Sequence, residues 1–178
     1  MQRVAFLFVT LALLTGSHLF AAEPAAFART TIDVGVVVSD INKSVKFYTE
    51  AIGLREAESF SVAGDYAADA GLTDKQPLSV RVLVLGEGDT ATKLKLMQIP
   101  GAKSKASDNQ FIHSQLGYRY LTIFVADATA AASRLKAAGV KPLGKGPLPL
   151  PPGFPEGMRL SVVRDPDGNL IELIGPVK

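Results

Sequence analysis

The sequence predicts an α+β fold made of two tandem β-α-β-β-β modules. The main observation is an internal repeat, in which an apolar strand runs into an aspartate, then a helix, then a glycine. The pattern occurs at residues 33–53 and returns at 120–139. Each copy is followed by three segments of alternating polar and apolar residues, as strands require. With 47% hydrophobic and 20% charged residues, the composition is that of a globular chain with a real core.

The sequence predicts a signal peptide followed by a short N-terminal segment at residues 1–28. Residues 29–178 are then expected to form one domain. Arg3 precedes an apolar run at residues 4–14, and small residues suited to cleavage follow. The alternative is an uncleaved anchor, although the run is short for a bilayer span of about 20 residues. We therefore expect an exported protein, periplasmic or secreted, with no membrane association after cleavage.

Several kinds of chemistry are excluded by composition. The chain has no cysteine, so disulfides and thiolate metal sites are ruled out. Its formal charge of +2 is too small to indicate a nucleic-acid partner. The two histidines are His18, inside the predicted signal peptide, and His113. A mature chain with one imidazole cannot build a multi-histidine metal site.

The first module covers residues 31–99. An apolar strand ends at Asp40, which is a natural helix N-cap, and Gly53 suits the left-handed position after the helix. The helix between them carries an apolar stripe made of Val45, Phe47, Tyr48 and Ile52. Alternation then predicts strands at residues 55–60, 78–85 and 92–98.

The second module covers residues 118–176 and repeats this order. Asp127 caps an alanine-rich helix that ends before Gly139, and strands are predicted at residues 140–143, 158–164 and 169–174. The last two strands are joined by a DPDGN turn at residues 165–169. Irregular stretches remain at 61–77, 100–117 and 143–157. Each of these is either a loop that borders the functional site or a flexible surface loop without such a role.

The two modules and the segment VVRDPDGNLIELIGP, residues 162–176, resemble the vicinal oxygen chelate superfamily. This group includes glyoxalases, bleomycin-resistance proteins and extradiol dioxygenases. The resemblance implies that the modules form a rolled, cup-shaped mixed sheet with the helices outside. It also implies a divalent metal in the cup, with ligands from the first and last strands of each module. In this sequence those positions are Asp33, Lys95, Tyr120 and Glu172.

Only Glu172 is a residue type usual at these positions. Each of the four interrupts an apolar alternation, which places it on the sheet face away from the helices. A protonated lysine has no lone pair and repels a cation, so we expect no metal cofactor. Our hypothesis is that Lys95 replaces the ion, and the alternative is a salt bridge that only satisfies the interior. A further alternative is Mg, Mn, Ni or Zn on oxygen ligands, with Lys95 turned away.

Further candidates for the cup are Arg81, Met97, Tyr118 and Phe124, which we predict on the same face. Arg81 beside a phenol suits an anionic or hydrogen-bonding organic ligand, although a solvent-exposed arginine at a sheet edge explains it equally well. His113 is expected in a surface loop. Its alternative is a base or a single metal ligand that reaches the cup.

These residues support three functions. The first is a metal-free protein that binds a small organic molecule in the cup through Asp33, Arg81, Lys95, Tyr120 and Glu172. The second is a lyase, isomerase or dioxygenase with Glu172 as its catalytic base and an oxygen-ligated metal. The third is an interaction module with a vestigial cup. The resemblance leaves open whether the cup closes within one chain or in a homodimer.

Overall fold

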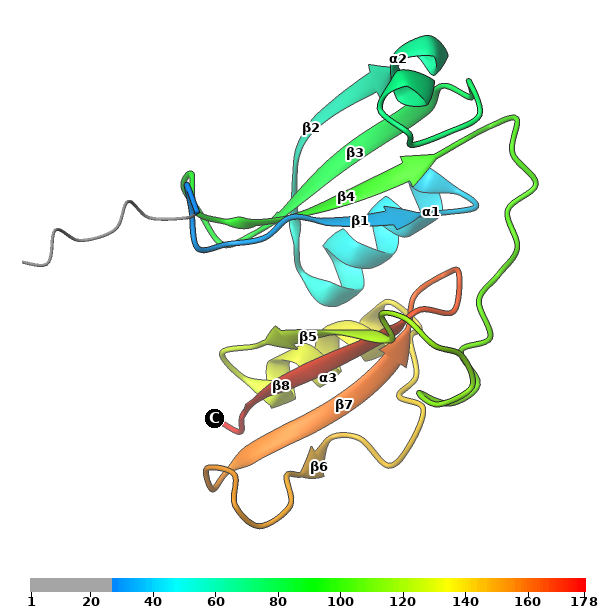
Figure 1. The fold of residues 1–178 in the computed structure, drawn as a ribbon. Helices are drawn as coiled ribbons and strands as arrows, with labels where there is room; N and C mark the ends of the chain where they lie inside the picture. The colour runs from blue at the N-terminus through cyan, green and yellow to red at the C-terminus, as the bar shows by residue number, and fades with distance from the viewer. Residues whose placement is uncertain (1–26) are drawn as a thin grey trace, which may run out of the picture.

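The computed structural model describes residues 27–178, which form two four-stranded sheets, one from each module. Figure 1 shows the first module above the second, with the long connection between β4 (Thr92–Gln98) and β5 (Tyr120–Phe124) running down one side of the molecule. The α+β prediction is confirmed. The predicted signal peptide falls almost wholly outside the described residues. Within residues 27–178, no helix reaches the length and apolarity that a bilayer crossing needs.

The first sheet has the strand order β1-β4-β3-β2. Its strands are β1 (Val34–Val37), β2 (Arg55–Val62), β3 (Leu78–Leu85) and β4 (Thr92–Gln98). β1 runs parallel to β4, and the other pairs are antiparallel. Asp40 caps helix α1 (Ile41–Lys46) by accepting from Asn42 N and Lys43 N. The chain continues into a π-helix, η1 (Phe47–Ile52), which ends at Gly53 with φ of 98°.

The second sheet repeats this plan with the order β5-β8-β7-β6. Its strands are β5 (Tyr120–Phe124), β6 (Leu148–Pro149), β7 (Met158–Arg164) and β8 (Leu170–Pro176). Helix α3 (Ala128–Ala137) follows Asp127, which accepts from Thr129 N as predicted. The equivalent pairs keep their directions, with β5 parallel to β8 and β7 antiparallel to it.

Two predictions about local structure are wrong. Residues 140–143 form no strand, and the fourth strand of the second sheet is the short β6 instead. Pro142 has no N–H to donate, so only Leu143 N reaches β7, at Val162 O. The irregular stretch 61–77 contains helix α2 (Gly64–Asp69). The helix begins at Gly64, a poor helix former, so the sequence pattern does not indicate it. Glycine is required there because a Cβ at this position would lie 2.0 Å from the Lys75 carbonyl oxygen.

The main core lies between the two modules. Helix η1 contacts α3, and the apolar cluster around them takes in side chains from both sheets. Tyr48 of the first module and Leu135 of the second occupy equivalent places in the repeat, and both are fully buried. The predicted stripe of Phe47, Tyr48 and Ile52 therefore packs against the other half of the chain as well as against its own sheet.

The DPDGN turn of the second module forms hydrogen bonds with the first module. Asp165 accepts from Asp167 N, Asn169 N and the Asn169 side chain, which closes the turn. Its Oδ2 also accepts a hydrogen bond of 2.9 Å from the Tyr48 hydroxyl, and both side chains are buried. Burial and the nearby Asp165 raise the pKa of Tyr48 above its ordinary value, so the phenol stays protonated and remains a donor. Asp167 accepts from Ser39 N beside this contact.

We predict that Tyr48→Phe lowers the free energy of unfolding by about 1.5–3 kcal/mol, because a buried carboxylate loses a donor. Urea unfolding followed by circular dichroism measures the change. The control is Tyr66→Phe in α2, where the ring is 69% exposed and little change is expected. Equal stabilities of the two variants would show that the Tyr48 hydrogen bond does not hold the modules together.

Candidate functional site

Asp33 and Lys95 form an ion pair on the first sheet. Asp33 directly precedes β1, and Gly35 is the register partner of Lys95 in β4. Lys95 Nζ lies 2.8 Å from Asp33 Oδ2, and Arg29 Nη2 lies 2.9 Å from Asp33 Oδ1. The Asp33 side chain is 15% exposed and that of Lys95 is 38% exposed. A carboxylate is therefore held between two cations at the end of the sheet.

This environment favours the ionised carboxylate. The hydrogen bond from Lys95 is the largest influence and lowers the pKa of Asp33, with a smaller contribution from Arg29, against the opposing effect of desolvation. The Arg29 guanidinium, 2.9 Å from Asp33 Oδ1, lowers this pKa in the same direction as Lys95. Asp33 is consequently ionised at neutral pH, and its negative charge is balanced by Lys95 and Arg29.

Tyr120 and Glu172 lie on the second sheet. Glu172 in β8 is the register partner of Thr122 in β5, and Thr122 Oγ1 donates to Glu172 Oε2 at 2.8 Å. Tyr120 precedes Thr122 by two residues and is 50% exposed. Leu121, Ile123, Ile171 and Leu173, which alternate with these residues, pack into the core on the helix side. Tyr120, Thr122 and Glu172 therefore share the face away from the helices, which the alternation predicts for Tyr120 and Glu172.

The structure thus gives two groups where the sequence suggested one. Asp33 and Lys95 meet on the first sheet, and Tyr120 and Glu172 share a face of the second. Among residues 27–178, no hydrogen bond or ion pair joins one group to the other. The expected pairing of Lys95 with a carboxylate involves Asp33 and not Glu172.

These side chains do not fit a divalent metal of the kind that the family resemblance implies. The ammonium of Lys95 occupies the hydrogen-bonding position at Asp33 Oδ2, where a metal would coordinate. In the described part of the chain, no three His, Cys, Asp or Glu side chains are grouped closely enough to hold an ion. The arrangement can accept hydrogen bonds and attract charged groups, and it offers no set of metal donors.

The predicted face of Arg81 is wrong. Val82 is the register partner of Lys95, so Arg81, one residue earlier, points to the opposite, helix-bearing side of the sheet. There its Nε donates to Glu56, and Nη1 donates to Asn42 Oδ1 at 3.4 Å. The Arg81 guanidinium lowers the pKa of Glu56, and Glu56 raises that of Arg81. Arg81 is therefore engaged on the side of the sheet away from Lys95.

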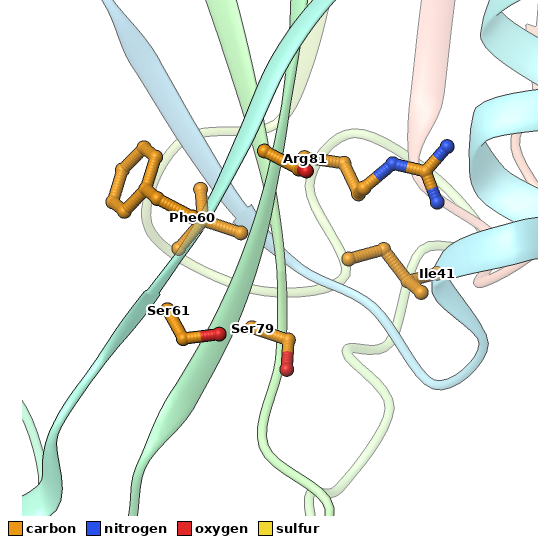
Figure 2. Close-up of a pocket in the computed structure, with 7 residues that line it drawn as sticks. Ile41, Phe60, Ser61, Ser79 and Arg81 are labelled. Atoms are coloured by element: carbon orange, nitrogen blue, oxygen red, sulfur yellow. The ribbon is translucent and has the colours of Figure 1, made fainter.

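Arg81 also lines a groove that sequence reasoning missed (Figure 2). The groove has a volume of about 370 Å³ and is lined by Ile41, Ser59, Phe60, Ser61, Ser79, Val80 and Arg81. Ser59 is the partner of Arg81 and Ser61 of Ser79, which places polar side chains in neighbouring rows of β2 and β3. The alternation of Ser59 and Ser61 along one strand is the sequence signal that could have indicated this groove. Figure 2 shows Phe60 and Arg81 on opposite sides of the strands.

Of the four remaining candidates, His113, Tyr118 and Phe124 are exposed and Met97 is partly buried. His113 stacks on Phe111 in the connection between modules, with ring centroids 5.5 Å apart, and its side chain lies in an exposed loop as expected. Tyr118 is fully exposed and Phe124 is 72% exposed. Met97 is the partner of Val37, which places it on the same side of the first sheet as Lys95.

We predict that Lys95→Met costs about 0.5–1 kcal/mol of stability at pH 7, since the pair is partly solvated. The folded-state pKa of Asp33 is lowered, so the stability that it contributes is present above its ordinary pKa and is lost as the pH falls through the folded value. The gap between variant and parent should therefore close in acid. Urea unfolding from pH 7 down to pH values below the ordinary Asp range measures it. Lys93→Met is the control. Lys93 Nζ lies 3.5 Å from Glu58 Oε1, which is a longer contact, and the Glu58 side chain is 60% exposed.

The comparisons with known proteins agree with the fold. A glyoxalase family protein from Bacillus cereus has 23% identity and a TM-score of 0.68, over 89% of this chain and 99% of that one. Trypanothione-dependent glyoxalase I from Leishmania major has 23% identity and a TM-score of 0.58, over 83% and 87% of the two chains. A virulence protein from Salmonella typhimurium has 25% identity and a TM-score of 0.52, over 86% and 100%.

No curated protein matches the sequence. The sequence does match a family description over most of its length, at residues 30–173. That match covers both modules, the Asp33–Lys95 pair and Glu172. The chain belongs to the Glyoxalase/Bleomycin resistance protein/Dioxygenase superfamily.

Proposed function

We propose that this protein binds a small organic molecule on the sheet faces away from its helices, without a divalent metal. The observation that carries the proposal is the 2.8 Å contact between Lys95 Nζ and Asp33 Oδ2. Relatives of this superfamily would place a metal ligand at each of these positions. Here the positive charge next to the carboxylate belongs to the protein, so binding does not require an ion.

Exposed apolar side chains support the proposed binding face. On the first sheet, Val37 and Phe60 are 45% and 46% exposed, and on the second sheet Tyr120 and Phe124 are more so. Their strand registers place all of them on the sides of the sheets away from the main core. Exposed apolar side chains beside a few charged groups are typical of sites for organic ligands.

We further propose that the protein acts outside the cytoplasm after removal of an N-terminal signal peptide. The charged start and short apolar run of the sequence support this part of the proposal. N-terminal sequencing of the protein recovered from culture medium or periplasm tests it, with a new N-terminus between Ala22 and Arg29 as the expected result.

Elemental analysis and thermal melting test the metal-free proposal. We expect substoichiometric metal in the purified protein and the same Tm in chelator as in excess Mg²⁺, Mn²⁺, Ni²⁺ or Zn²⁺. A metal at 100 times its Kd would stabilise the fold by about 2.7 kcal/mol and raise Tm by roughly 5–10 °C. A shift of that size with any of the four ions would overturn the proposal.

The neutral fluorescent probe N-phenyl-1-naphthylamine tests the binding face. Its fluorescence should rise with the folded protein, and Phe124→Ser should weaken the binding about threefold or more because apolar contact area is lost. Tyr66→Ser is the matched control, since Tyr66 is an exposed ring on α2. Equal binding to both variants would place the apolar site elsewhere.

A further inference from the structure

We propose that the ligand is an organic cation, bound over Glu172 between the rings of Tyr120 and Phe124. This inference rests on the proposed function and adds the charge of the ligand. The surface concerned is the open face of the second sheet, defined by Tyr120, Thr122, Phe124, Leu160, Val162, Glu172 and Ile174.

Glu172 supplies a fixed negative charge at the centre of this face. Its strand, β8, lies between β5 and β7, and its register partners are Thr122 on one side and Val162 on the other. The 2.8 Å hydrogen bond from Thr122 holds one carboxylate oxygen in place. Within residues 27–178, no lysine or arginine forms an ion pair with Glu172. The charge is therefore available to a ligand.

Two aromatic rings stand on either side of this carboxylate. Tyr120 and Phe124 are each two residues from Thr122 on the same face, about 7 Å away along the strand. They are 50% and 72% exposed. A cation is attracted to an aromatic face within about 6 Å of the ring centroid, a distance that these side chains can cover from their positions. An ammonium group over Thr122 would meet π-electrons as well as the carboxylate.

The rest of the open face suits the apolar substituents of such a cation. Leu160, Val162 and Ile174 are partly buried and form the floor beside Phe124 and Glu172. Arg164 is the one other charged side chain on this face in β5, β7 and β8. Its guanidinium donates to the carbonyls of Gly168 and Gln110, at 3.0 and 3.2 Å, and is engaged at the turn end of the sheet.

The first sheet has the opposite charge balance. There Asp33 is in contact with both Lys95 and Arg29, so the group carries a net positive charge. Lys93, which shares the face of Lys95, lies 3.5 Å from Glu58, and this pair leaves the net charge of the face unchanged. An organic cation is repelled from this group and attracted to Glu172, which selects the second sheet.

Choline and its neutral isostere 3,3-dimethylbutan-1-ol test the inference, because they differ in charge and scarcely in shape. Titration of the protein followed by NMR chemical shifts should show choline binding about tenfold more tightly. The shifted resonances should be those of Tyr120, Thr122, Phe124 and Glu172. Glu172→Gln keeps an acceptor for Thr122 and should reduce the preference to about threefold or less.

Phe124→Leu should weaken choline binding about threefold or more and leave the isostere nearly unchanged. Tyr66→Leu is the control, because Tyr66 is an exposed ring on α2, outside both sheet faces. Equal affinity for choline and the isostere would overturn the cation inference while the proposed function stands. If neither compound nor N-phenyl-1-naphthylamine shifts these resonances, both proposals fail. A dimer by light scattering that covers Tyr120 and Phe124 would also overturn the inference.

Discussion

The hydroxyl of Tyr48 donates to Asp165 across the junction of the two modules, and the main core is organised around this buried contact. Asp165 is also the residue that closes the DPDGN turn, so one carboxylate both shapes the end of the second sheet and attaches it to helix η1 of the first module. The helices thereby pack against each other in the shared core. Each sheet has a second face outside this main core, and on the first sheet that face carries a smaller buried cluster of Leu78, Val80 and Val82.

Those two free faces carry different chemistry. On the first sheet, the charge of Asp33 is balanced by Lys95 and Arg29. On the second sheet, Glu172 is held by a neutral hydroxyl and surrounded by apolar and aromatic side chains. In this glyoxalase-like fold, the polar groups of the two faces therefore differ in charge.

Much of the local structure follows from the sequence. Asp40, Asp127 and Gly53 occupy the helix-end positions that their side chains favour, and three of the predicted strands agree with the structure to the residue. The failures lie where local signals are weak. A helix that starts at Gly64 depends on close contact with the Lys75 carbonyl, and the two-residue β6 depends on pairing with β7. Neither contact partner is adjacent in the sequence.

The sequence by itself determined the two-module fold, the strands that carry Lys95, Tyr120 and Glu172, and the face of each, because helix capping and period-two alternation are local properties. Only the tertiary structure decided which of these side chains meet. Arg81 faces the helices because Val82 is the residue in register with Lys95, and Lys95 pairs with Asp33 because β4 lies beside β1. Register and strand order come from packing between distant segments, which alternation within one strand cannot specify.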